Sequence, residues 1–350
     1  MSRVRVLVSD DSFFMRAAIK KILAAEPSVE VVGEAKDGAD AVAKVRALAP
    51  DVVTMDFNMP VLDGAGAVRE IMRIKPTPVI MLSAHTTEGA RETLEALAAG
   101  AVDFLAKPSG EVSADFTRIA PSLIAKVLAA AEASLDKLGM AALVDKTAPR
   151  PIPTPGRRST LPPLGAPGRV AIVGVSTGGP AALGRFLPQL PSDPGFGLVI
   201  VQHMPDGFTR ALADRLDAQC AVRVREAQSG DRPDPGVAFV APGDRHLEVA
   251  PDGTLQVIDG PEVNGVRPSA DVTMRAAARV WGRRAIGVVM TGMGRDGVEG
   301  LLAIKRAGGA TYAQDKSSSV VFGMPKAAIE AGAVDKVVPL DELAHALQHR

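Results

Sequence analysis

The sequence has little cysteine, few aromatic residues and no long uninterrupted apolar run. Its single cysteine, Cys220, excludes an intramolecular disulfide and a metal site built from several cysteines. No apolar run approaches the roughly 18 residues that a membrane-spanning helix requires. The first residues, MSRVRVLVSDD, place charges inside and directly after the apolar stretch, unlike a secretory signal peptide. These features predict a cytoplasmic protein with no direct insertion into a membrane.

Net charge is also lacking, because 40 Lys and Arg residues balance 40 Asp and Glu residues. A strongly basic nucleic-acid-binding protein is therefore disfavoured, and no nucleic-acid partner is expected. Hydrophobic residues make up 47% of the chain and charged residues 23%, a balance typical of globular proteins. Aromatic residues are only 3%, so aliphatic side chains must fill the core. Such a core suits buried parallel strands covered by helices.

The chain divides at a proline-rich segment. Its 350 residues exceed the roughly 100–200 of one domain, which predicts two domains. Seven of the 19 residues from Pro149 to Pro167 are proline, and such a segment tends to extended conformations that bury no core. We therefore expect a linker over 140–168. It separates a first domain at 1–125, with a helical extension to about 139, from a second domain at 169–350.

Both domains show short apolar runs that alternate with amphipathic helical segments. This alternation predicts a doubly wound α/β fold for each domain, with a parallel sheet covered on both faces. Residues 246–250 and 254–258 flank Pro-Asp-Gly and predict an antiparallel hairpin in the second domain. The expected strands of the first domain are 4–8, 29–32, 52–55, 79–82 and 102–105, and those of the second include 170–175, 198–202, 222–224, 237–240, 286–290 and 311–313.

Polar residues follow four strands of the first domain, where ligands bind in open α/β sheets. Asp10 and Asp11 follow the first strand, Asp56 ends the third, Ser83 the fourth and Lys107 the fifth. Three carboxylates at one sheet edge repel one another unless a cation lies among them, and oxygen ligands of this kind suit Mg²⁺. An aspartate in this setting can also form an acyl phosphate. A single acid after a strand, such as Asp10 or Asp11 alone, is commonly a helix cap, whereas the joint pattern across three strand ends is far rarer.

A serine follows the first strand of the second domain. Gly174-Val175-Ser176-Thr177-Gly178 fits G-x-S-x-G at a strand–turn–helix junction, a geometry that exposes a serine hydroxyl. Main-chain N–H groups at the start of the helix suit an oxyanion. By itself the motif is weak, since Ser176 could equally be a helix N-cap. No lysine follows Gly178-Gly179 as a phosphate-binding loop requires.

A histidine and an aspartate follow two further strands of the same sheet. His203 lies in Gln202-His203-Met204-Pro205, and Asp296 lies in the glycine-rich stretch 290–297. Among the five histidines only His203 and His246 lie near strand ends of the second sheet. A serine, a histidine and an aspartate on three strand-end loops provide what nucleophilic acyl transfer needs. The order Ser…His…Asp differs from the Ser…Asp…His order of α/β-hydrolases, which excludes that family.

The acids at 10, 11 and 56 with Ser83, Lys107 and Pro108 resemble the pattern of a response-regulator receiver domain over residues 1–125. The resemblance implies a flavodoxin-like fold with five parallel strands. It implies phosphorylation of Asp56, contacts from Ser83 and Lys107 to the phosphoryl group, and Phe104 at the aromatic switch position. It also implies Mg²⁺ held by the following ligands: Asp10, Asp11, Asp56 and the main-chain carbonyl of Asn58.

GVSTGG, QHMP and TGMGRDG together resemble the catalytic domain of the chemotaxis protein-glutamate methylesterases of the CheB family, over about 168–345. APGDRH, RPSADV and SVVFGMP extend the resemblance. It implies Ser176 as nucleophile, His203 as base and Asp296 as the acid that orients it. The main chain around Thr177 and Met293 is implied as the oxyanion donor.

The resemblance therefore implies a phosphorylation-controlled serine hydrolase without a cofactor for its ester chemistry. Its expected substrates are glutamate methyl esters, and selected glutamines, on methyl-accepting chemoreceptors, and its expected phosphodonor is a chemotaxis histidine kinase. The alternative from another class is a receiver fused to a non-enzymatic module that binds a nucleotide or a partner through its glycine-rich loops. A DNA-binding output domain is less favoured because the chain carries no net charge and shows no helix-turn-helix pair.

Overall fold

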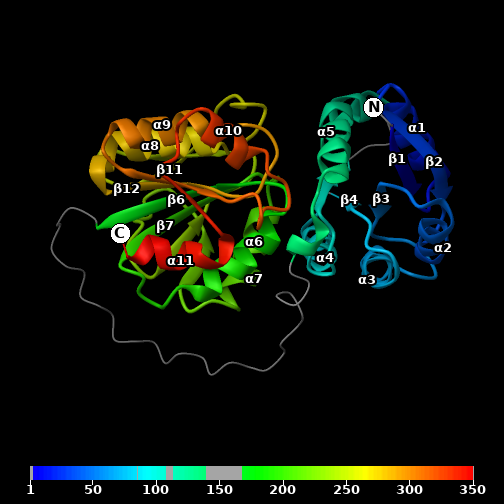
Figure 1. The fold of residues 1–350 in the computed structure, drawn as a ribbon, viewed down its shortest axis with the longest axis horizontal. Coiled ribbons are helices and arrows are strands. Elements are labelled where there is room, and N and C mark those ends of the chain that lie inside the picture. Colours follow the sequence, from blue (N-terminus) through cyan, green and yellow to red (C-terminus); the bar gives the residue numbers. More distant parts are fainter. Residues whose placement is uncertain (1–2, 85, 108–112, 139–167, 350) are drawn as a thin grey trace.

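The fold is described from a computed structural model of the chain, which describes residues 3–84, 86–107, 113–138 and 168–349. It forms two α/β lobes that lie side by side (Figure 1). The predicted linker at 140–168 falls almost wholly outside the described residues. Within those residues, no helix is both long enough and apolar enough to cross a membrane.

The first lobe is a five-stranded parallel sheet in the order β2-β1-β3-β4-β5. Apolar side chains fill both faces of this sheet, and helices cover them. This order and these helices confirm the flavodoxin-like fold predicted for the receiver. The strands are β1 Val4–Ser9, β2 Val29–Ala35, β3 Val52–Asp56, β4 Val79–Ser83 and β5 Asp103–Ala106. The helices are α1 Phe13–Ala24, α2 Gly38–Leu48, α3 Gly64–Ile74, α4 Thr87–Ala98 and α5 Ser113–Ala131, followed by the 3-10 turn η1 Leu135–Leu138.

The second lobe has a seven-stranded sheet in the order β14-β13-β12-β6-β7-β9-β8, and every neighbouring pair is parallel. A separate antiparallel hairpin, β10-β11, confirms the predicted insertion. The sheet strands are β6 Arg169–Val175, β7 Phe196–Gln202, β8 Arg223–Glu226, β9 Val237–Val240, β12 Ala285–Val289, β13 Ala310–Gln314 and β14 Lys336–Val338, and those of the hairpin are β10 His246–Val249 and β11 Leu255–Ile258.

Helices cover both faces of the second sheet. One layer holds α6 Gly179–Phe186, α7 Phe208–Asp217 and α11 Leu340–Gln348; the other holds α8 Ala270–Trp281, α9 Val298–Arg306 and α10 Met324–Glu330 (Figure 1). The chain starts this sheet at the central strand β6, builds one side through β7, and later builds the other through β12. The carboxyl ends of these three neighbouring strands therefore form the switch point at which open α/β sheets bind ligands.

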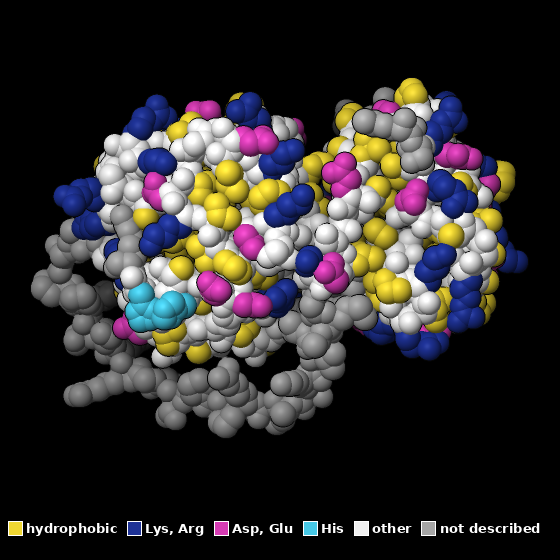
Figure 2. Space-filling model, viewed as in Figure 1, with side chains coloured by type: hydrophobic (Ala, Val, Ile, Leu, Met, Phe, Trp, Pro, Cys, Tyr) yellow, Lys and Arg dark blue, Asp and Glu magenta, His cyan; other side chains and the backbone are white. Residues whose placement is uncertain are grey.

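The two lobes touch through β5 and α4 of the first and α6 and α7 of the second. The ring of Phe104 stacks on that of Phe208, with centroids 4.6 Å apart. The Val102 carbonyl accepts a hydrogen bond from Gly178 N at 3.2 Å. Acidic and basic side chains occur on both lobes on the face drawn in Figure 2. The contact between the lobes thus combines aromatic stacking with directed hydrogen bonds.

Candidate active site and acidic pocket

Ser176 lies on the turn between β6 and α6. Its N–H donates to the Thr291 carbonyl at 3.0 Å, and the buried amide of Gln202 donates to the Ser176 carbonyl at 3.1 Å. Gly178, at φ +75°, occupies the left-handed region, and a Cβ there would lie 2.7 Å from Val320 Cβ. Only glycine fits this turn without strain. The turn holds Ser176 half-buried at the carboxyl end of the sheet.

His203 and Asp296 meet at the same edge of the sheet. His203 follows β7, Asp296 lies in the loop after β12, and His203 Nε2 is 2.8 Å from Asp296 Oδ2. The two side chains are 9% and 3% exposed. An ionised carboxylate can only accept a hydrogen bond, so this contact places the proton of neutral His203 on Nε2. Nδ1 is then the basic nitrogen of the ring.

Hydrogen bonds keep the Asp296 carboxylate charged although it is buried. Its Oδ1 accepts from Ser269 Oγ at 2.6 Å, and its Oδ2 accepts at 2.6 Å from Ala270 N, at the start of α8. Burial by itself raises the pKa of Asp296, but hydrogen bonds from His203, Ser269 and Asn264 outweigh it and lower the pKa to about 2. Asp296 is therefore ionised throughout the neutral range.

The other strand-end histidine, His246, has both ring nitrogens occupied. Nε2 contacts the Pro261 carbonyl at 2.8 Å, and Nδ1 accepts from Ser269 N at 3.3 Å. The side chain is buried. His246 therefore supports the loop that carries Ser269, and His203 is the histidine with a nitrogen left for proton transfer.

Two main-chain N–H groups beside Ser176 are unused. Those of Thr177 and Met293 make no hydrogen bond within the part of the chain that the structure describes. The Thr177 carbonyl accepts from Thr291 Oγ1 at 2.9 Å, which ties the nucleophile turn to the loop that carries Met293. Free N–H groups fixed beside a nucleophile suit an oxyanion.

The structure does not join Ser176 to His203 directly. Among the hydrogen bonds of the described residues none involves Ser176 Oγ, whereas the sequence predicts that His203 takes its proton. Contacts of this kind commonly tighten only when substrate binds. The structure thus brings the base and its orienting acid together and places the nucleophile on the next strand-end loop.

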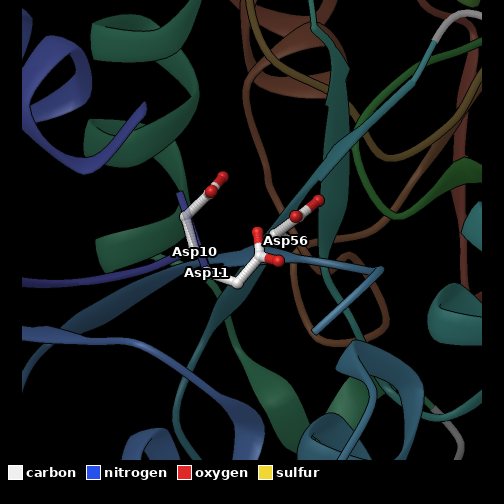
Figure 3. A group of neighbouring side chains, drawn as sticks. All are labelled: Asp10, Asp11 and Asp56. Carbon is white, nitrogen blue, oxygen red and sulfur yellow. The ribbon is translucent and has the colours of Figure 1, made fainter. Parts of the chain in front are cut away.

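The predicted acids of the first lobe also come together. Each of Asp10, Asp11 and Asp56 offers a carboxylate oxygen, and these oxygens lie within 4.8 Å of one another (Figure 3). The ammonium group of Lys107 lies 2.9 Å from Asp10 Oδ2 and 2.7 Å from Asp56 Oδ1. Burial raises the pKa of Asp56 to about 6, against the opposing effect of Lys107. Burial alone lowers the pKa of Lys107, but Asp56 and Asp10 raise it overall.

This acidic pocket fits a divalent cation. Its donors are hard oxygen atoms, the preferred ligands of Mg²⁺. A cation there would also relieve the repulsion between Asp10 and Asp56 that adds to the raised pKa of Asp56. The cluster of Asp10, Asp11 and Asp56 is consistent with the Mg²⁺ site predicted from the sequence.

The remaining predicted residues of this lobe are Ser83, Asn58 and Phe104. Ser83 is buried, and its hydroxyl donates to the Gly89 carbonyl at 3.0 Å. The Asn58 side-chain amide donates to Glu92 at 3.2 Å. Phe104 is buried because its ring packs on the second lobe. Ser83 and Phe104 thus connect the pocket edge to α4 and to the lobe contact.

The sequence motifs do not identify three of the site residues, namely Asn264, Ser269 and Asp271. Ser269 and Asp271 belong to the RPSADV stretch. Helix α8 begins within this stretch, and a helix N-terminus attracts a carboxylate, which is the one signal that points to it. Taken together, the fold and site define a class of protein, a response regulator whose output domain is an ester hydrolase.

Comparison with known proteins bears this out. Residues 171–347 match the CheB methylesterase family, and residues 6–114 match the response regulator receiver domain. The protein-glutamate methylesterase/protein-glutamine glutaminase of Symbiobacterium thermophilum is 47% identical over 347 residues, covering 98% of this chain and 96% of the relative. The protein of the same description from Pyrococcus abyssi is 46% identical, covering 97% and 92%.

A solved structure agrees for the second lobe. The CheB methylesterase catalytic domain of Thermotoga maritima is 41% identical, with a TM-score of 0.50, and the match covers 52% of this chain and 97% of that one. The chain belongs to the CheB family of protein-glutamate methylesterases/protein-glutamine glutaminases that carry an N-terminal receiver domain.

Proposed function

We propose that the protein removes methyl groups from glutamate methyl esters on chemoreceptors and deamidates selected glutamines there, with Ser176 as nucleophile. The observation that carries this proposal is the 2.8 Å contact between His203 and Asp296 beside the Ser176 turn. The relatives named above carry the same activity in their descriptions. Every group needed for this chemistry is a side chain or main-chain N–H of this chain, so no cofactor enters the ester reaction.

In the first half of the reaction, Ser176 Oγ attacks the ester carbonyl carbon and its proton passes to His203 Nδ1. The carbonyl oxygen becomes an oxyanion, which the N–H groups of Thr177 and Met293 stabilise. Asp296, ionised at neutral pH, stabilises the imidazolium that forms. The imidazolium then protonates the leaving methoxide. Methanol departs and a glutamyl ester on Ser176 remains.

In the second half, water gives a proton to His203 and attacks the glutamyl ester. The second tetrahedral intermediate expels Ser176 Oγ, which regains its proton from His203, and the receptor glutamate leaves as a carboxylate. A glutamine amide follows the same route with ammonia as the first leaving group. Ester and amide share the tetrahedral intermediate, so one site can serve both reactions.

We propose that a chemotaxis histidine kinase donates a phosphoryl group to Asp56. Asp10, Asp11 and Asp56, with the carbonyl of Asn58, would hold Mg²⁺, which would neutralise negative charge on the incoming phosphoryl group. Lys107 and Ser83 would contact its oxygens. Lys107 already lies 2.7 Å from Asp56. We propose a cytoplasmic location, because such receptors present their methylated segments there to the kinase and the esterase.

The lobe contact supports control of the esterase by the receiver. Asp103 Oδ2 accepts from Thr177 Oγ1 at 2.5 Å, and the Val102 carbonyl holds Gly178 N. The receiver thus forms hydrogen bonds to Thr177 and Gly178, the two residues that follow the nucleophile. We propose that phosphorylation of Asp56 shifts Ser83 and Phe104 and weakens these hydrogen bonds. Residues 169–350 then act as the catalytic unit and 1–125 as its regulator, joined by the segment 140–168.

Methanol release from methylated receptor tests the proposed chemistry. Ser176→Ala removes the attacking atom and should lower the rate by roughly 10³-fold or more, with an unchanged melting temperature. Cys220→Ser is the control for a rival thiol nucleophile and should stay within a few-fold of the parent rate. Near-normal activity of folded Ser176→Ala would contradict the serine mechanism, and no methanol release by the parent protein or by its 168–350 fragment would favour the binding-module alternative.

A further inference from the structure

A second buried carboxylate lies beside the catalytic acid. Asp271, in the first turn of α8, is 2% exposed, as is Asp296. Asp271 Oδ1 accepts from Gly300 N at 2.7 Å. Two carboxylates buried this close together repel each other unless donors lie between them. The mechanism above uses only one of them, so the other needs an explanation.

One side chain bridges the two carboxylates. The amide nitrogen of Asn264 lies 2.9 Å from Asp296 Oδ1 and 2.8 Å from Asp271 Oδ2. An amide NH₂ has two hydrogens, so it can donate one to each acid. Both of its hydrogens are then committed to carboxylates, and Asn264 has none left for the substrate.

The backbone at Asn264 suits this bridge. Asn264 and Gly265 have φ values of +57° and +73°, and Val263 and Val266 pair across them. Positive φ at both central residues is the two-residue hairpin turn for which Asn-Gly is preferred. The turn itself is exposed, and it directs one amide inward to the buried acids. An asparagine here therefore satisfies both the turn and the two carboxylates.

The pKa of Asp271 is raised and the pKa of Asp296 is lowered, as the arrangement of donors around the two acids predicts. Burial raises the pKa of Asp271, and the charge of Asp296 raises it further. The pKa of Asp296 is lowered to about 2, with Asn264 among the donors responsible. The other charged or titratable groups that bear on the pair are His203 from the end of β7 and Arg275 from α8.

We propose that Asn264 is a positioning residue for the esterase reaction, whose amide bridges Asp296 and Asp271 and so sets the proton affinity of the His203–Asp296 pair. This inference rests on the proposed roles of His203 and Asp296. Asn264 acts through Asp296 and does not touch the substrate. The negative charge of Asp271 raises the proton affinity of the pair, and the hydrogen bonds from the Asn264 amide oppose this effect.

Removal of the bridge and removal of the second charge should have opposite effects. Without the Asn264 amide, the two carboxylates lose a hydrogen-bond donor, and the His203–Asp296 pair binds a proton more readily. The acidic limb of the pH–activity profile therefore moves to higher pH. The negative charge of Asp271 attracts a proton to the cluster. Without that charge the cluster binds a proton less readily, so the acidic limb moves to lower pH. Each shift should be about one pH unit, at the lower end of the effect that a nearby charge has on a pKa.

The test measures kcat/KM for methanol release between pH 5 and pH 9 in the full chain. Asn264→Gly removes the amide and keeps the turn, because glycine adopts positive φ freely. Asp271→Asn removes the charge, and the double variant combines both changes. Glu262→Gln, an exposed charge change on the same loop, is the matched control. The melting temperature of each variant reports folding.

We expect the acidic midpoint to rise in Asn264→Gly, to fall in Asp271→Asn, and to return towards the parent value in the double variant. The rate at high pH should stay within about tenfold of the parent in Asn264→Gly, and Glu262→Gln should show no shift. Unshifted midpoints, or shifts of the same sign in both single variants, would overturn the inference. If Asp296→Asn and His203→Ala remain fully active, the proposed catalytic roles of His203 and Asp296 fail, and if the parent chain releases no methanol, the proposed function fails; both outcomes are distinct from unshifted midpoints.

Discussion

Asp103 of the receiver accepts a hydrogen bond from the hydroxyl of Thr177, the residue directly after the nucleophile, at 2.5 Å. The same Asp103 oxygen lies 2.6 Å from the ammonium group of Lys126 on α5. Phe104, the next residue on β5, stacks on Phe208 of the second lobe. One short strand therefore connects the predicted switch residue of the receiver to the catalytic turn.

Loss of the Asp103 carboxylate should raise the activity of the unphosphorylated enzyme. Asp103→Ala removes the contact to Thr177 and weakens the docking of the receiver, so basal methanol release should rise several-fold. Lys126→Gln breaks only the ion pair inside the receiver and should raise it less. Initial rates of the purified full-length variants check this. Equal basal rates in the parent and in Asp103→Ala would show that this hydrogen bond does not restrain the esterase.

His203→Ala should be more damaging than Asp296→Asn. The first removes the proton acceptor. The second keeps the base but loses the charge that stabilises its cation and fixes its tautomer. We expect a loss of roughly 10⁴-fold or more for His203→Ala and a loss about tenfold to a hundredfold smaller for Asp296→Asn. The reverse order in folded protein would contradict the assigned roles.

Binding of Mg²⁺ to the receiver should weaken as the pH falls through the pKa of Asp56, which is about 6 in the absence of metal. Above this pH the carboxylate is ionised and ready to bind. Below it, binding must release a proton, so the apparent Kd should rise by up to about tenfold per pH unit. Calorimetric titration with MgCl₂ at pH 7.5 and pH 5.5 measures the change. Asp56→Asn should remove this pH step, and an identical Kd at both pH values in the parent would contradict it.

The sequence predicts that the site residues lie near one another, because the carboxyl ends of parallel strands lie at the same edge of a sheet. Ser176, His203 and Asp296 each follow such a strand, Asp10 follows β1, and Asp56 is the last residue of β3. That these strands share one carboxyl edge follows from the α/β pattern, whereas the order that makes β12, β6 and β7 neighbours does not. The sequence therefore predicted the common edge on which the acids of the first lobe and the His203–Asp296 pair meet.

Other features depend on contacts that no local pattern encodes. Asp103 and Thr177 lie 74 residues apart on different lobes, so their hydrogen bond depends on how the lobes dock. Asn264 reaches Asp296 across 32 residues from an exposed turn whose Asn-Gly sequence indicates only a hairpin. The edge strand β14 is short and two of its three residues are exposed, so it lacks the buried apolar run that marks the central strands β6, β7 and β12.

The central claim is that the receiver restrains a serine esterase until Asp56 is phosphorylated. The most direct test is the initial rate of methanol release from methylated receptor by the full-length enzyme, before and after addition of a small-molecule phosphodonor with Mg²⁺. The rate should rise several-fold to the level of the 168–350 fragment, and Asp56→Asn should keep its basal rate without responding. A fragment no faster than the unphosphorylated full-length enzyme, or a rise that persists in Asp56→Asn, would contradict the claim.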